Sequence, residues 1–237
     1  TGTRITDIDT GNPGATKGVK LTFSEGTGAS GTMKVDSVLF ALGVKPVIGE
    51  NGLENLNLKL QGNGIKVSAT METYEPGVFA IGDMTGLFPL AHVASEQGII
   101  AAETIAGLET EPLDYDRIPR CTYCIPEVAS IGLSEEEAGR TGKKVSAGTF
   151  PLYANGKALS LGDGEGFVKI VSDRGTGEIL GVHMCGPHVT EMISGVSVAM
   201  QLECTVEELA RAVHPHPTLS EAIKEAALAA AGSAIHI

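Results

Sequence analysis

The sequence contains no tryptophan, and phenylalanine, tyrosine and tryptophan together make up only 4% of its 237 residues. Because proteins hold single-stranded nucleic acids largely by stacking bases on aromatic side chains, this scarcity argues against such a partner. Cationic residues are also few, with 17 Lys and Arg against 29 Asp and Glu, and the formal net charge is -12. A negative field of this kind repels phosphate backbones and anionic membrane surfaces. The composition therefore predicts neither a nucleic-acid nor a membrane partner.

Cysteine is equally scarce, with four residues in the whole chain. Four thiols in a chain of this length do not build a disulfide framework, so we expect a reducing compartment, and the cytoplasm fits best. A membrane helix needs a run of about 18 uncharged apolar residues, and the sequence has none. The N-terminus has neither an initiator Met nor the layout of a signal peptide, and it begins inside an expected strand. We therefore expect the chain to be part of a longer protein.

Hydrophobic residues, in contrast, make up 42% of the chain, and 31 glycines predict many tight turns between buried elements. In the first half, residues 19–23 alternate with period two and predict a half-buried strand, whereas residues 37–42 and 78–81 are continuous apolar runs that predict buried strands. The stretch from 90 to 108 predicts a helix closed by Gly107. Strand, Gly-Asp, loop and helix is the order of ligand sites in open α/β sheets.

The second half of the chain predicts an α+β module instead. Polar residues with prolines at 112 and 119 mark a domain boundary ahead of it. Strands are expected at residues 127–133, 145–152, 166–171 and 179–183, and helices at 190–202, 205–212 and 218–231. The last helix is opened by Pro217 and closed by Gly232. Strands followed by helices in about 120 residues make a domain of ordinary size.

Three short motifs match known sites by letter alone. Residues 26–31 read GTGASG and fit the GxGxxG dinucleotide fingerprint, but a strand rather than a helix is expected to follow, so we interpret them as a hairpin loop. Cys121 and Cys124 form a CxxC pair in strand-like surroundings, away from the helix start that makes such pairs reactive, and we expect two buried thiols. His214 and His216 lack a third ligand at local spacing, so no metal site is predicted.

The stretch HPHPTLSE, from His214 to Glu221, is the strongest candidate for chemistry. Thr218 and Glu221 have the Thr-x-x-Glu spacing of a capping box, so one interpretation is that Glu221 only begins the helix. The alternative is that the Glu221 carboxylate reaches an imidazole nitrogen of His216, fixes its tautomer and raises its basicity. A base oriented in this way is what deprotonation of a thiol near neutral pH requires, and a proline on each side of His216 restricts its motion.

A second candidate is Asp83, which follows an expected strand and Gly82. Aspartate is a favoured helix N-cap, so Asp83 could serve only to begin a turn or helix. The alternative is that its carboxylate accepts hydrogen bonds from a ligand hydroxyl, such as one on a ribityl chain, at the end of a strand.

Several strings together resemble the pyridine-nucleotide disulfide oxidoreductases, and most closely the dihydrolipoamide dehydrogenases. In chain order they are DSVLFALG at 36–43, VFAIGD at 78–83, LAH at 90–92, PEVASIGL at 126–133, ANGKA at 154–158, GVHMCGP at 181–187 and the histidine string at 214–221. The resemblance covers nearly the whole chain. Its strength lies in the common order of the strings, since each alone is a weak indication.

The resemblance implies an α/β and α+β chain in three parts. Residues 1–45 would end an NAD-binding domain, residues 46–112 would end an FAD-binding domain, and residues 113–237 would form a dimerisation domain with an antiparallel sheet. It also implies FAD and NAD as cofactors. The residues implied in cofactor binding are Asp83 for the ribityl chain, Pro89, Leu90, Ala91 and His92 for the isoalloxazine, and Gly43 near the nicotinamide nucleotide.

The implied activity is oxidation of dihydrolipoamide with NAD through a redox disulfide and FAD. In such homodimers, His216 paired with Glu221 would act as the base in the other subunit's active site, and the implied partner is a lipoyl-bearing acyltransferase or lipoyl carrier protein. The family's FAD fingerprint, redox cysteine pair and NAD-site glycine motif have no counterpart here, and Val44 and Cys124 stand where Arg and Thr are frequent. Two alternatives therefore remain, a related enzyme such as glutathione reductase and a non-catalytic dimerisation fragment.

Overall fold

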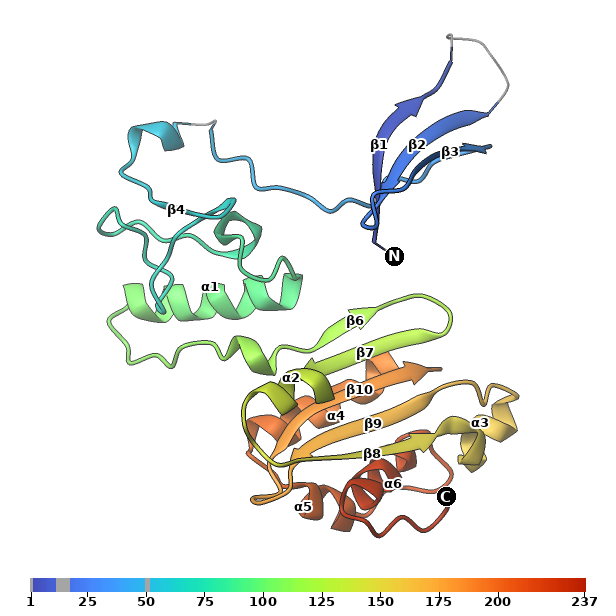
Figure 1. The fold of residues 1–237 in the computed structure, drawn as a ribbon. Helices are drawn as coiled ribbons and strands as arrows, with labels where there is room; N and C mark the ends of the chain where they lie inside the picture. Colours follow the sequence, from blue (N-terminus) through green and yellow to red (C-terminus); the bar gives the residue numbers. More distant parts are fainter. Residues whose placement is uncertain (1, 12–17, 50–51) are drawn as a thin grey trace. The chain divides into compact units, whose positions relative to one another are not determined.

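The computed structural model describes residues 2–11, 18–49 and 52–237 and divides the chain into two compact units, Thr1–Pro46 and Val47–Ile237 (Figure 1). The first unit holds a three-stranded antiparallel sheet of β1 (Thr3–Asp9), β2 (Val19–Glu25) and β3 (Ser30–Val35), in that order. The strand predicted at 19–23 is confirmed, and the first four residues of GTGASG form the predicted hairpin loop, while Ser30 and Gly31 begin β3. The three-part domain division stays a prediction.

The apolar run at residues 37–42 does not form the buried strand predicted for it. The structure assigns no strand there, and Leu39 and Leu42 are 91% and 89% exposed. A buried strand needs a neighbouring strand for its amides and a surface over its side chains, and the described part of the chain supplies neither. The prediction was wrong because an apolar sequence carries no information about the surface that covers it.

The second unit begins with short elements and one long helix. These are the 3-10 turn η1 (Leu53–Asn55), the strands β4 (Leu60–Gln61) and β5 (Gly64–Ile65), the 3-10 turn η2 (Gly82–Thr85) and the helix α1 (Ala91–Ile105). The predicted helix is confirmed, and Gly107 follows it with a positive φ of 73°. The buried strand predicted at 78–81 is wrong, because Phe79 makes a single bridge to Glu72 and Ile81 is 40% exposed.

The C-terminal part of this unit is built on a five-stranded sheet. Its strands, all antiparallel to their neighbours, are β6 (Arg120–Thr122), β7 (Glu127–Gly132), β10 (Ile179–Gly186), β9 (Phe167–Asp173) and β8 (Val145–Pro151), in that spatial order. The shorter helical elements are η3 (Tyr115–Arg117), α2 (Glu135–Arg140), η4 (Leu152–Ala154) and α3 (Gly156–Leu161). They are followed by α4 (Val189–Gln201), α5 (Val206–Arg211) and α6 (Glu221–Ala230). This confirms the predicted α+β module with an antiparallel sheet.

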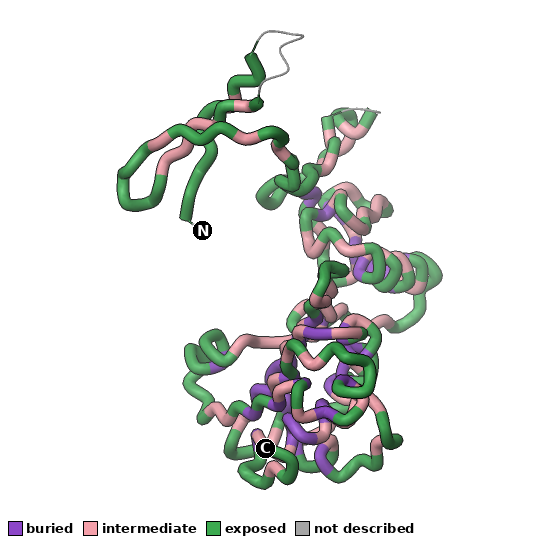
Figure 2. Tube along the Cα trace, turned by 90° about the vertical axis from the view of Figure 1, so that its right-hand side faces the viewer, coloured by how far each residue is buried: buried purple, intermediate pink, exposed green. Residues whose placement is uncertain are grey.

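The core of this module lies between the sheet and the helices α4 and α6 (Figure 1). Alternate side chains of the central strands divide between the two faces, so Ile170 and Val182 join the main core while Val171 packs with Ala138 of α2 on the other face. Helix α6 crosses β8 at Gly148, where an added Cβ would lie 2.1 Å from a backbone nitrogen of α6. Figure 2 shows the buried residues gathered in this part of the chain.

No helix within the described ranges is long and apolar enough to cross a membrane.

Candidate functional site

The turn between α5 and α6 brings His216 and Glu221 into contact. Glu221 Oε1 lies 3.0 Å from His216 Nδ1, and the second oxygen, Oε2, accepts a hydrogen bond of 2.9 Å from the backbone N–H of Thr218. The two interpretations of Glu221 are therefore compatible, because each of its oxygens serves one of them. The capping box itself is incomplete, since the Thr218 hydroxyl donates to the carbonyl of Pro215.

Glu221 is held in its ionised form. Burial acts to raise the pKa of Glu221, whose side chain is 28% exposed, but the Thr218 amide and the His216 imidazole outweigh it, so the pKa lies below its ordinary value. A carboxylate on Nδ1 selects the tautomer that carries its hydrogen there and leaves Nε2 free to accept a proton. The His216 side chain is 77% exposed, so a substrate proton can reach it. The pair has the geometry of an oriented base.

A cavity of about 320 Å³ opens beside this pair. Its lining includes His214, His216 and Glu221, together with a second imidazole and carboxylate, His236 and Glu225. The predicted flavin segment, residues 83–92, contributes nothing to the lining. The predicted base and the predicted flavin segment therefore do not share this cavity.

The second imidazole–carboxylate pair was not found from the sequence. Glu225 Oε1 lies 2.8 Å from His236 Nδ1, and Oε2 accepts from the backbone N–H groups of Ile235 and His236. Burial acts to raise the pKa of Glu225, and the bonds from His236 and Ile235 outweigh it, so the pKa is lowered. The i,i+4 spacing of Glu221 and Glu225 places both carboxylates on one helix face, which is the signal the sequence offers. The position of His236 had no local signal.

The predicted flavin segment surrounds the start of α1. Asp83 is exposed within η2, and its side chain caps no helix. Helix α1 begins at Ala91 after Leu90, with no side-chain cap and no acidic residue in its first turn, so its first amides are not bonded by a cap. His92 Nε2 lies 3.0 Å from the carbonyl oxygen of Pro119. The segment thus combines a free carboxylate with free N–H donors.

Gly43, predicted near a nicotinamide nucleotide, lies in the first unit. It is exposed, its φ is 78°, and no atom lies within 4 Å of the position that a Cβ would take. A positive φ is a conformation that glycine adopts without strain. Its predicted role is not tested by this geometry and stays a prediction.

The CxxC pair differs from its prediction. Cys121 is half-buried against the main core, but Cys124 is exposed, so the expectation of two buried thiols is wrong. The reason is that Cys124 follows the end of β6 and lies in the turn, where its thiol donates to the carbonyl of Pro126 at 3.1 Å. Burial and the charge of Glu127 raise the pKa of the Cys121 thiol, which disfavours the reactive thiolate.

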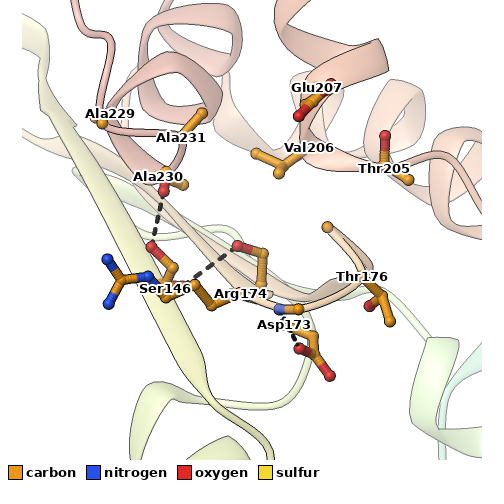
Figure 3. A pocket seen from close by; sticks show the side chains of 14 residues that line it. Ser146, Asp173, Arg174, Thr176, Thr205, Val206, Glu207, Ala229, Ala230 and Ala231 are labelled. Atoms are coloured by element: carbon orange, nitrogen blue, oxygen red, sulfur yellow. Dashed lines mark hydrogen bonds between the residues drawn. The ribbon is translucent and has the colours of Figure 1, made fainter.

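A larger cavity of about 500 Å³ lies where the turn between β9 and β10 meets the ends of α5 and α6 (Figure 3). Its polar groups serve the local backbone, since the Ser146 hydroxyl donates to the carbonyl of Ala230 and Asp173 Oδ1 accepts from the N–H of Gly175. None of the predicted site residues lines it. Across the part of the chain that the structure describes, no three His, Cys, Asp or Glu side chains are grouped to hold a metal ion.

Comparison with known sequences gives two matches in one family. Residues 1–98 match the family model for pyridine nucleotide-disulphide oxidoreductase, and residues 118–227 match the model for that family's dimerisation domain. A dihydrolipoyl dehydrogenase of Bacillus subtilis (strain 168) is 50% identical over 213 residues, which are 90% of this chain and 45% of the relative. A dihydrolipoyl dehydrogenase of Rhizobium etli is 40% identical over 237 residues, or 100% of this chain and 48% of the relative. The chain spans about half the length of these relatives.

Solved structures give the same architecture. LpdA from Mycobacterium tuberculosis matches with a TM-score of 0.82 and 30% identity, covering 95% of this chain and 48% of that one. The HOCl-induced flavoprotein disulfide reductase RclA from Escherichia coli matches with a TM-score of 0.80, covering 94% of this chain and 50% of that one, and at 21% identity it supports the fold alone. The chain belongs to the pyridine nucleotide-disulphide oxidoreductase family, and residues 118–227 are its dimerisation domain.

Proposed function

We propose that this chain supplies the C-terminal portion of an FAD-dependent dihydrolipoyl dehydrogenase, an enzyme that oxidises dihydrolipoamide with NAD. The observation that carries the proposal is the 3.0 Å contact between His216 Nδ1 and Glu221 Oε1, which orients an exposed imidazole as a base. The names of the relatives support the same activity. Because the chain spans about half of their length, the activity is proposed for the protein that carries this chain.

His216 and Glu221 perform the proton transfer in this proposal. Glu221 accepts a hydrogen bond from Nδ1–H, so Nε2 of His216 is free to take the proton from one thiol of the dihydrolipoyl group. The thiolate that forms attacks a redox disulfide, one S–S bond forms as another breaks, and the displaced sulfur leaves as a thiolate. The ionised Glu221 stabilises the imidazolium produced by this step. The redox cysteine pair has no counterpart in the 237 residues, so this chain's own contribution is the base.

The flavin segment has the donors and acceptors that FAD needs. Asp83 presents a free carboxylate to ribityl hydroxyls, and the first amides of α1, after Pro89 and Leu90, are donors for the isoalloxazine. An added Cβ at Gly82 would lie 3.3 Å from the Cβ of Ala94. Glycine therefore lets the backbone beside Asp83 pack closely against α1. When bound, FAD would accept the electron pair of the dithiol and pass it to NAD, whose nicotinamide is proposed to lie near Gly43.

We further propose a homodimer in which His216 serves the other subunit's active site. The dimerisation domain supports this, and so does the cavity beside His216, whose lining excludes residues 83–92. The proposed partner is a lipoyl-bearing acyltransferase or a lipoyl carrier protein, and the proposed compartment is the cytoplasm, where four unpaired thiols persist.

The test is the rate of NAD reduction by dihydrolipoamide in the flavin-containing protein that carries this chain. His216→Gln removes the base and is expected to lower kcat/KM by about 10²–10⁴-fold. Glu221→Gln is expected to lower it less, because the amide still accepts from Nδ1 but carries no charge to stabilise the imidazolium. The matched control is His214→Asn, in the same string, which should retain the wild-type rate.

Undiminished turnover in His216→Gln would remove the base assignment. A protein that reduces glutathione disulfide and leaves dihydrolipoamide unoxidised would instead be a related disulfide reductase, as glutathione reductase is.

A second candidate is a non-catalytic dimerisation module, proposed for the 237-residue chain by itself. The well-packed core of the dimerisation domain favours it, as does the exposure of Asp83 and of the run at 37–42. Sedimentation and visible absorbance of the purified chain distinguish the two cases. A colourless dimer is expected, and stoichiometric FAD with turnover in the chain alone would exclude this candidate.

A further inference from the structure

A fully buried amide links the start of the flavin segment to the residues that directly precede the dimerisation domain. Gln97, in the middle of α1, is 0% exposed. Its Oε1 accepts a hydrogen bond of 2.7 Å from the backbone N–H of Gly82, and its Nε2 donates to the hydroxyl of Tyr115 at 2.8 Å. A primary amide has one acceptor end and one donor end, so it can link these two groups at once. Because buried polar groups are costly when unpaired, both contacts are strongly favoured.

The link continues from Tyr115 to the first strand of the dimerisation sheet. The Tyr115 ring stacks on Phe88, with ring centroids 5.4 Å apart and an interplanar angle of 26°. The guanidinium of Arg120, at the start of β6, lies 4.8 Å from the centroid of the Phe88 ring. A parallel contact joins His92 Nε2 to the carbonyl of Pro119 at 3.0 Å.

Phe88, among the residues that form this link, has a strained backbone conformation. Its φ is 45°, in the left-handed region that bulky side chains rarely adopt. Such a conformation persists only where the surroundings hold it, and here the ring of Tyr115 and the guanidinium of Arg120 lie against the Phe88 ring. Phe88 directly precedes the predicted flavin contacts. Its conformation therefore sets the direction in which the chain enters α1.

We propose that Gln97 and Tyr115 are positioning residues that hold the flavin segment against the stretch from Tyr115 to Arg120, which leads into the dimerisation domain. Gln97 fixes the Gly82 peptide, and that peptide sets the direction of the adjoining Asp83. Tyr115 fixes the middle of the segment through Phe88. The inference rests on the proposed function of Asp83 and residues 89–92, and it adds that the shape of this segment depends on the dimerisation domain.

The test is amide hydrogen exchange in the 237-residue chain, measured for residues 82–90. Tyr115→Phe keeps the ring and its stacking but leaves Gln97 Nε2 without an acceptor, and Gln97→Leu removes both bonds. Exchange of the Gly82 amide is expected to accelerate about tenfold in Gln97→Leu and less in Tyr115→Phe. The matched control is Tyr74→Phe, which removes the hydroxyl of a half-exposed tyrosine in the same part of the chain and should leave exchange unchanged.

A conservative variant separates positioning from packing. In Gln97→Glu one carboxylate oxygen accepts from Gly82 and the other from the Tyr115 hydroxyl, so protection of the Gly82 amide should recover relative to Gln97→Leu. Unchanged exchange at 82–90 in Gln97→Leu would overturn the inference. So would an equal loss of protection throughout α1, β7 and β10, because that pattern indicates general destabilisation.

The flavin-containing protein supplies the second measurement. Tyr115→Phe should accelerate FAD dissociation by a factor similar to its effect on Gly82 exchange. If no preparation binds FAD, the proposed function fails while the exchange result still decides the link between Gln97 and the segment. If FAD binds and dissociates at the wild-type rate in Tyr115→Phe and Gln97→Leu, the inference fails and the proposed function stands.

Discussion

Apolar strands in the dimerisation domain are buried, whereas the apolar run at 37–42 is exposed. Ile170 in β9 and its neighbour Val182 in β10 are fully buried, whereas Leu39 and Leu42 are about nine-tenths exposed. Strand β10 lies between β7 and β9 and beneath α4, while the run at 37–42 pairs with no strand among the described residues. Figure 2 shows mostly exposed residues near the N-terminus and many buried residues in the part of the chain near the C-terminus. An apolar run thus favours burial, but whether it is buried depends on which strands and helices pack against it.

The contrast also separates the two kinds of predicted site residue. His216 and Glu221 lie on a packed module that fixes their geometry, so their contact can be described atom by atom. Asp83 and Gly43 are exposed, and for neither of them does the structure show a side-chain partner among the residues it describes. Large exposed apolar segments commonly mark surfaces that bind another molecule or domain. We therefore expect the run at 37–42 to be a surface that another molecule or domain covers.

The largest effect on stability is expected when the buried side chain of Ile170 is truncated. Ile170→Ala leaves a cavity between the sheet and its helices and should lower the free energy of unfolding of the dimerisation domain by about 2–5 kcal/mol. The matched variant is Leu42→Ala, which removes a similar volume from an exposed site and should change it by less than about 0.5 kcal/mol. Denaturant titration followed by circular dichroism measures both. Equal losses would mean that the two regions do not differ in packing.

A smaller effect is expected where α6 crosses β8. In Gly148→Ala the new methyl group would lie 2.1 Å from the backbone nitrogen of Ala230, so the helix must shift, at a cost of about 1–3 kcal/mol. The control is Gly139→Ala in α2, where no atom lies within 4 Å and the better helix propensity should leave stability equal or slightly higher. Thermal unfolding ranks the two variants. An unchanged unfolding temperature in Gly148→Ala would show that α6 can move away from β8 at little cost, contrary to this prediction.

The smallest expected effect is on the pH dependence of stability. The pKa of Glu225 is lowered by its bonds to the C-terminal segment despite burial, so its stabilising contribution is present above the unfolded pKa of about 4.3 and is lost as the pH falls through the lower folded value. Glu225→Gln should therefore flatten the fall in stability on the acid side. Unfolding free energies measured at several acidic pH values give the slope. An unchanged slope would falsify the role assigned to this carboxylate.

The sequence predicted the elements that depend on local pattern. Alternation and turn residues located β7 to β10, and helical periodicity located α1 and α4 to α6, because these signals arise within each segment. The contact between His216 and Glu221 was also predictable, since the two residues are five apart across a helix start. The runs at 37–42 and 78–81 were misassigned because an apolar run has the same appearance whether or not it finds a partner strand.

Local sequence patterns predicted the α+β module and offered the pairing of His216 with Glu221 as one interpretation, and the order of the motifs indicated the family. Three features became visible only in the three-dimensional structure: His236 lies against Glu225, Gln97 links Gly82 to Tyr115, and Cys124 is exposed. The physical reason is separation along the chain. Periodicity, capping and turn preferences act over a few residues, whereas these contacts form only after the sheet and helices have brought distant segments together.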